Sequence, residues 1–225
     1  MVQCQYCKVH LPQAETLSHD GRFYCSKEHL NTLDQQGWIG AAAWYMSPNK
    51  DARPEGVNLD LLVIHYISLP PSEFKSSSSS QHIVNFFQNK LDPNAHPYFA
   101  EIEGQKVSSH FLITRTGELI QFVSTKDRAW HAGASSFMGR ERCNDFSIGV
   151  ELEGDGDTPF EDIQYSSLAK LVQKLQWTYP NLQFAGHSDV APERKTDPGE
   201  YFDWKKFQKE TGISQEKIPY GLVSR

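Results

Sequence analysis

Apolar runs separated by polar, Pro-rich and Gly-rich stretches predict alternating strands and helices along most of the chain. Leu59–Ser68 is a mostly apolar run with β-branched members, which is typical of a buried central strand. Shorter runs at Phe146–Glu153 and Leu182–His187 predict two further strands. Two β-like runs within 106–123 flank the polar residues 115–118, so we expect a hairpin there.

Helix signals lie between these strands. The segment 158–161 supplies a Thr N-cap, a Pro at the first helical position and a Glu at the third, and it predicts a helix that ends before Pro180. Gln81–Lys90 and Trp204–Glu210 predict two shorter helices. Residues 68–81 contain two prolines and five consecutive serines, which favours a mobile loop. The alternation predicts an α/β protein with a mixed central β-sheet flanked by helices.

Composition and charge narrow the class of protein. Hydrophobic residues make up 38% and charged residues 22% of the 225 residues, which is typical of a globular protein. No stretch approaches the ~18–20 apolar residues that span a bilayer, and the start of the sequence lacks the pattern of a signal peptide. These features predict a cytoplasmic protein without a membrane partner. The net charge of −6 argues against nucleic acid as a partner, because phosphate binding needs a basic face.

The distribution of cysteines suggests a division of the chain. Three of the four cysteines precede residue 36, and the fourth is Cys143. We therefore expect a zinc-finger-like module over 1–36, a connector over 37–57 and a larger α/β domain over 58–225. Without an export signal, thiols or metal ligands are expected rather than disulfides.

The N-terminal cysteines follow the spacing C-x2-C-x17-C-x3-H, with the ligands Cys4, Cys7, Cys25 and His29. Three thiolates and one imidazole complete a tetrahedral structural Zn²⁺ site. Such a metal would stabilise a segment too short to fold by burial alone. His10 and His19 are alternative fourth ligands, and three unrelated thiols are the simpler alternative. The segment has no basic patch, so we expect it to contact a protein or to pack on the larger domain.

Polar residues at the ends of the predicted strands indicate a second, catalytic metal site. His65 interrupts an apolar strand, His187 closes another, and Asp197 follows ten residues later in a polar loop. Two imidazoles and a carboxylate suit a Zn²⁺ ion with one open position, where the pKa of water falls to about 7. Such a site also needs a base and a cation, for which Glu151 and Lys195 are candidates.

The residues alone leave alternatives to this second site open. A lone buried histidine is more often a hydrogen-bonded structural side chain than a ligand. Glu153 lies on the same strand face as Glu151, because strand side chains repeat every two residues, and it is the rival base. The linear zinc motif H-E-x-x-H is absent.

Five segments, which follow one another in this order along the sequence, resemble a known protein family. They are VIHYISLPP (63–71), LDPNAHPYFA (91–100), VSSHFLITRTGELIQFV (107–123), RAWHAGASSFMGRERCNDFSIGVELEG (128–154) and GHSDVAPERKTDPG (186–199). These segments resemble the AmpD-type 1,6-anhydro-N-acetylmuramyl-L-alanine amidases of the peptidoglycan-recognition-like zinc amidase superfamily. The resemblance implies hydrolysis of the amide between N-acetylmuramic acid and L-alanine in anhydro-muropeptides, during cell-wall recycling. Typical members lack the N-terminal module.

The resemblance also implies roles for single residues. His65, His187 and Asp197 match the zinc ligands, Glu151 matches the catalytic glutamate, and Lys195 matches the lysine that holds the oxyanion. The rival expectations are a muropeptide-binding module that does not cleave, and a regulatory protein that acts through the finger.

Further positions match residues near the substrate or behind the metal. Trp130 and Arg142 match positions beside the bound muropeptide. Tyr66 replaces the usual Asn after the first ligand, and Lys106 replaces an Arg, so Lys106 loses the forked donor geometry. His110 and His131 are expected to support the ligands from behind. Cys143 is expected to be a small buried residue.

Overall fold

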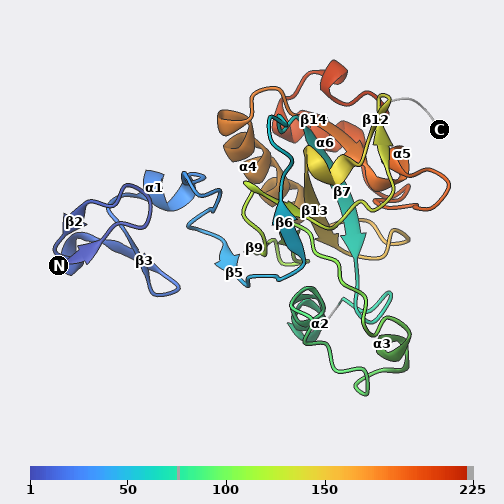
Figure 1. Cartoon of the computed structure of the whole chain (residues 1–225), viewed down its shortest axis with the longest axis horizontal. Coiled ribbons are helices and arrows are strands. Elements are labelled where there is room, and N and C mark those ends of the chain that lie inside the picture. Colours follow the sequence, from blue (N-terminus) through green and yellow to red (C-terminus); the bar gives the residue numbers. More distant parts are fainter. Residues whose placement is uncertain (75–76, 222–225) are drawn as a thin grey trace.

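The computed structural model describes residues 1–74 and 77–221. Its centre is a six-stranded mixed sheet in the order β14-β7-β13-β8-β9-β5 (Figure 1). The central strands run parallel to one another, and β9 pairs antiparallel with β8 and parallel with β5. The predicted α/β class, with a mixed central sheet flanked by helices, is therefore confirmed.

The elements have the following bounds. The strands are β1 (Val2–Gln3), β2 (His10–Leu11), β3 (Leu17–His19), β4 (Arg22–Tyr24), β5 (Ala43–Trp44), β6 (Lys50–Ala52), β7 (Leu61–Ile67), β8 (Phe111–Ile113), β9 (Leu119–Gln121), β10 (Asp127–Ala129), β11 (Ser136–Phe137), β12 (Arg140–Glu141), β13 (Ser147–Glu153) and β14 (Gln183–Gly186). The α-helices are α1 (Lys27–Asn31), α2 (Ser77–Phe87), α3 (Pro97–Glu101), α4 (Asp162–Thr178), α5 (His187–Val190) and α6 (Trp204–Thr211). The 3-10 helices are η1 (Gln13–Glu15), η2 (Cys143–Asp145) and η3 (Gln215–Lys217).

The two faces of the sheet pack against different partners. Ile64 of β7 and Val150 of β13 lie in the main core, which also contains the apolar side of α4. Val63 points to the opposite face and packs with residues around β11, η2 and α5. Because successive strand residues alternate between faces, His65 and Glu151 belong to the face opposite α4. The two are directly paired in the parallel register of β7 and β13, so the fold brings two predicted site residues together.

The predicted strands and hairpin are present, but several element boundaries differ. The helix predicted from 158–161 begins at Asp162 instead, because Asp155 accepts a hydrogen bond from the Thr158 amide and holds that residue in a turn. Glu161 is the N-cap, and its amide donates to the Gln164 side chain at 3.0 Å.

Two further boundaries also depart from the prediction. His187 starts α5 rather than ending a strand. Residues 77–80 of the segment predicted as a mobile loop form the first turn of α2, and Ser80 donates to Glu153; residues 75–76 lie outside the described residues. The prediction of a loop is therefore wrong for the C-terminal end of this segment, because α2 packs against the sheet.

The N-terminal module lies beside the sheet, next to β5 (Figure 1). The segment predicted as a connector contributes β5, the last strand of the sheet, and β6, which pairs with β10. Arg22 of the module donates to the Ala42 carbonyl at 2.9 Å and lies 3.7 Å from the centre of the Trp44 ring. Tyr24 and Leu33 are buried. The module is therefore packed on the larger domain, as one of the two sequence expectations proposed.

No helix in the described part of the chain combines the length and the apolar composition that crossing a bilayer requires.

Candidate active site

Three predicted metal ligands meet at the carboxyl ends of β7 and β14. Nδ1 of His65 lies 2.9 Å from Nδ1 of His187 and 2.9 Å from Oδ2 of Asp197. His187 Nδ1 lies 3.1 Å from the same carboxylate oxygen. Ligand atoms about 2.0–2.1 Å from a tetrahedral zinc ion stand roughly 3.3 Å apart. The three donors therefore converge as one face of a metal site, although their elements are far apart in the sequence.

The electrostatics of this cluster suit a cation. Burial, together with the nearby His187, lowers the pKa of His65 to about 4, so its imidazole is neutral at physiological pH. Burial opposes ionisation of Asp197, but its contacts with His187 and His65 outweigh this effect and hold the pKa of the carboxyl well below its usual range. The cluster thus presents the neutral imidazole of His65 and the carboxylate of Asp197, which are the protonation states in which these groups bind a metal.

Hydrogen bonds to the outer ring nitrogens orient both imidazoles. Nε2 of His187 lies 3.2 Å from the Ala132 carbonyl, which can only accept, so its proton is on Nε2 and Nδ1 is free for a metal. His65 Nε2 lies 3.0 Å from Nδ1 of His131, and Nε2 of His131 lies 3.1 Å from Oγ of Ser147. A proton on each Nε2 satisfies this chain and leaves the His65 Nδ1 lone pair toward the cluster. His131 therefore contacts a predicted ligand directly.

A single glycine makes room for the His131 ring. A Cβ atom at Gly149 of β13 would lie 2.6 Å from Cγ of His131, far inside van der Waals contact. The amide of Gly149 also donates to Nδ1 of His110 at 3.0 Å. His110 is thus one layer further from the metal cluster, against the His131 ring at 5.7 Å between ring centres.

The two candidate bases have different surroundings. Burial, and secondarily the charge of Asp197, raise the pKa of Glu151 well above its usual value, while Lys195 opposes this shift. Its buried Oε2 atom has no hydrogen-bond partner among the described residues. Glu153 instead accepts hydrogen bonds from Ser80 and from the Arg115 amide at 2.9 Å. Glu153 is engaged in structural contacts, and Glu151 is the carboxylate that faces the charges of the site.

The four predicted substrate residues have different placements. Trp130 is half-buried and directly precedes His131, and Arg142 is exposed in a left-handed backbone conformation next to η2. Lys106 is exposed and lines a separate cavity of about 280 Å³ near α3.

The placement of Tyr66 argues against a direct substrate contact. Its ring packs against the main core on the α4 side of β7, because alternation turns it away from the face of His65. Its hydroxyl lies 3.5 Å from Oγ1 of Thr196, so it supports the loop that carries Asp197.

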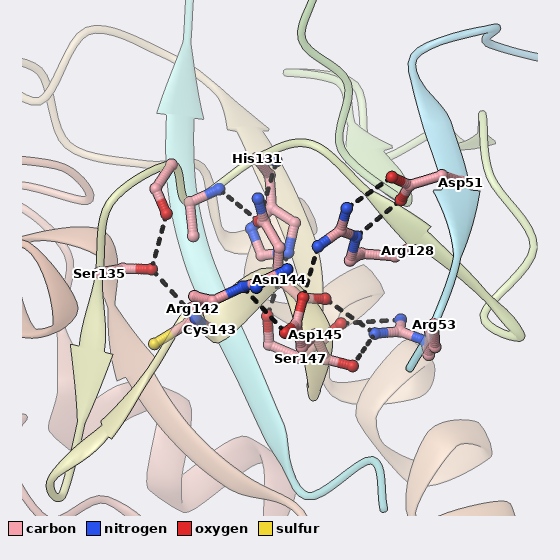
Figure 2. A network of polar contacts seen from close by, with 12 residues as sticks. Asp51, Arg53, Arg128, His131, Ser135, Arg142, Cys143, Asn144, Asp145 and Ser147 are labelled. Carbon is pink, nitrogen blue, oxygen red and sulfur yellow. Dashed lines mark hydrogen bonds and ion pairs between the residues drawn. The ribbon is translucent and has the colours of Figure 1, made fainter. Parts of the chain in front are cut away.

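Sequence reasoning missed a polar network beside the metal cluster (Figure 2). Arg53 donates to the carbonyls of Asn144, Asp145 and Ser147 at 2.8–3.0 Å, and burial lowers the pKa of its guanidinium to about 10. The Asn144 side chain accepts from the His131 and Ala132 amides. Arg53 belongs to the predicted connector, and no sequence signal there indicated a role, since its partners lie about 90 residues away.

The N-terminal cysteines form a second cluster of metal-ligand type. Cys7 and Cys25 sulfurs are 3.7 Å apart, and Nδ1 of His29 lies 3.8 Å from the Cys4 sulfur and 3.0 Å from that of Cys25. The edges of a zinc–thiolate tetrahedron are roughly 3.8 Å long. The fourth donor in this cluster is His29 of α1, while the alternatives His10 and His19 lie outside it.

The thiol chemistry of this cluster also fits a cation. Burial raises the pKa of Cys4, but backbone amide donors outweigh it and bring the value to about 6. Burial and the neighbouring thiols raise the pKa of Cys25 to about 11. Ionisation of Cys25 beside the other sulfurs is therefore unfavourable unless a cation is present.

Residues 55–200 match the profile of the Amidase_2 family, described as N-acetylmuramoyl-L-alanine amidase. The chain belongs to this family of hydrolases, in which zinc dependence is typical. Among relatives, it is 49% identical over 176 residues to the 1,6-anhydro-N-acetylmuramyl-L-alanine amidase AmpD of Haemophilus influenzae, covering 77% of this chain and 94% of that protein.

Solved structures give the same result. A crystal structure of a selenomethionine derivative of AmpD superposes with a TM-score of 0.74 at 49% identity, covering 78% of this chain and 97% of that one. AMPDH3 from Pseudomonas aeruginosa, determined in complex with anhydromuramic pentapeptide, superposes with a TM-score of 0.51 at 26% identity, covering 72% of this chain and 62% of that one. The predicted family is therefore confirmed for the larger domain.

Proposed function

We propose that the chain hydrolyses the amide bond between 1,6-anhydro-N-acetylmuramic acid and the L-alanine of the stem peptide, in the recycling of peptidoglycan fragments. The observation that carries this proposal is the convergence of His65, His187 and Asp197 on one point, next to the buried carboxylate of Glu151. The similarity to AmpD, whose name states this activity, supports the same substrate.

The donor set fits Zn²⁺ held by His65, His187 and Asp197. When bound, the ion would supply Lewis acidity to the attacking water and to the scissile carbonyl. Glu151 accepts the proton of the attacking water as the new C–O bond forms, and it delivers that proton to the amide nitrogen as the C–N bond breaks. Its raised pKa suits both roles. The ammonium group of Lys195 stabilises the negative charge that develops on the carbonyl oxygen.

The experiment is product analysis on 1,6-anhydro-N-acetylmuramyl tripeptide, combined with metal content. We expect release of the free tripeptide and of anhydro-N-acetylmuramic acid. Glu151→Gln should keep the metal and lose about 10²- to 10⁴-fold in kcat, whereas Asp197→Ala should lose this metal and the activity together. Binding of the muropeptide by the zinc-loaded protein without release of peptide would instead support a non-catalytic sensor.

We further infer a structural Zn²⁺ ion at Cys4, Cys7, Cys25 and His29. The spacing of the donors and the opposition among the thiols support it. The contacts of Arg22 with Ala42 and Trp44 support a module that acts as part of one body with the amidase domain rather than as a nucleic-acid reader. Two zinc ions per chain are expected from elemental analysis, and one would reject the finger. A cytoplasmic location and a protein partner of the module stay predictions.

A further inference from the structure

A row of alternating charges runs from Asp51 through Arg128 and Asp145 to Arg142 (Figure 2). Arg128 of β10 faces Asp51 of β6 directly across the antiparallel pair. Its Nε and Nη2 donate to the two oxygens of Asp51, in the bidentate geometry that favours arginine, and its Nη1 donates to Oδ1 of Asp145 at 2.6 Å. Arg128 therefore holds two carboxylates from segments that are 94 residues apart in the sequence.

Each of these carboxylates also contacts one predicted substrate residue. Oδ2 of Asp145 lies 3.2 Å from Nε of Arg142. The Trp130 side chain lies close enough to Asp51 to lower the pKa of this carboxyl, although Arg128 is the larger cause. The order along the row is thus Trp130, Asp51, Arg128, Asp145 and Arg142. The Trp130 end of the row stands beside the metal cluster, since Trp130 directly precedes His131, which contacts His65 at 3.0 Å.

The exposure of the row differs along its length. The side chains of Arg128 and Asp145 are 20% and 14% exposed, whereas that of Arg142 is 69% exposed. Arg142 contacts Asp145 through its Nε atom. Its two terminal nitrogens, Nη1 and Nη2, therefore lie at the exposed end of the side chain. This geometry presents the forked donors of Arg142 to an anionic group such as a peptide carboxylate.

We propose that Arg128 is a positioning residue for substrate binding, which sets the placement of Trp130 and Arg142 through Asp51 and Asp145. The proposal rests on the amidase function proposed above. The physical reason is charge balance: with Arg128 in place, two carboxylates face two guanidinium groups. Without Arg128, Asp51 loses its guanidinium partner and Asp145 keeps only Arg142. The excess negative charge then competes with the substrate carboxylate for Arg142. The indole of Trp130 then also loses a neighbouring carboxylate whose position Arg128 fixes.

The test compares steady-state hydrolysis of 1,6-anhydro-N-acetylmuramyl tripeptide by the wild-type protein, Arg128→Gln and a matched control, Arg140→Gln. Arg140 also binds a carboxylate bidentately, at 2.9 Å to both oxygens of Asp60, and lies over the Phe146 ring in the same region. We expect Arg128→Gln to raise KM about tenfold with kcat within about twofold, because only binding common to ground and transition states is lost. Arg140→Gln should leave both parameters unchanged.

Two further measurements separate positioning from a general structural effect. In an Arg142→Ala background, Arg128→Gln should change KM by no more than about threefold, because residues that act as a unit are not additive. A tripeptide substrate with amidated carboxyl groups should likewise reduce the difference between the wild-type protein and Arg128→Gln. Zinc content is measured in parallel and should be equal in all variants. If Arg128→Gln does not fold, Arg128→Lys replaces it and should give a smaller rise in KM, because lysine keeps the charge without the fork.

The outcomes distinguish this inference from the proposed function. An active wild-type protein whose KM is unaffected by the change at Arg128, or is affected equally without Arg142, overturns the positioning role and leaves the amidase intact. A wild-type protein that releases no peptide overturns the proposed function, and the positioning role falls with it.

Discussion

Replacement of Gly149 by alanine tests whether the His131 ring is set by the surface of β13. The added Cβ would lie 2.6 Å from Cγ and 2.7 Å from Nδ1 of His131. Normal contact between such atoms is about 3.5–4.0 Å, so the ring must retreat by about 1 Å. The hydrogen bonds of His131 with His65 and Ser147, now 3.0 and 3.1 Å, would then exceed the ~3.5 Å at which such bonds fail.

The expected cost has two parts. Two neutral hydrogen bonds contribute about 1 kcal/mol each, and overpacking costs about 1–3 kcal/mol, so the metal-free protein should lose about 3–5 kcal/mol in its free energy of unfolding. Loss of the group that orients a metal ligand typically weakens metal binding by about 10- to 100-fold. Urea unfolding in the presence of a chelator measures the first quantity, and competition with a chromophoric chelator measures the second.

A second substitution sharpens this test. His131→Ala should relieve the overpacking in the Gly149→Ala protein, yet zinc binding should stay weak because the ring behind His65 is gone. His110→Ala is the matched control: it removes the other imidazole beside Gly149, but the nearest atoms to the added methyl group all belong to His131. Equal rescue by both substitutions, or wild-type zinc affinity in Gly149→Ala, would refute the reasoning.

Two further predictions concern the module and the core. Cys25→Ser should remove one zinc ion per chain and lower the thermal stability of the module, while the second zinc ion and the amidase activity remain, since the two clusters share no ligand; elemental analysis beside an activity assay checks this, and loss of both metals would contradict it. Leu168→Ala in α4, at a fully buried position of the main core, should destabilise the protein by about 2–5 kcal/mol with unchanged KM. Denaturant unfolding measures that loss, and a change under about 1 kcal/mol would count against the assigned core.

Local sequence patterns were sufficient to predict those strands and helices that are determined by residues close together in the chain. The apolar run around β7, the hairpin of β8 and β9, and the helix that ends before Pro180 follow from periodicity and turn chemistry. The start of α4 was misplaced because the competing acceptor, Asp155, acts through a turn that a capping pattern does not describe. The first turn of α2 was missed because a serine run has no strong local helix propensity, and the contact that holds Ser80 to Glu153 joins residues 73 positions apart.

The sequence by itself determined the family, the kind of donors at both clusters and the spacing of the cysteine ligands. These features depend only on residue types and their order along the chain, which the sequence gives directly. Only the tertiary structure decided which side chains share a face and which lie next to one another. Alternation along β7 directs His65 to the metal cluster and Tyr66 to the core, although they are adjacent in the chain. The contacts of Arg53 and Arg128 join segments up to 94 residues apart, and such contacts arise from packing, which no local pattern encodes.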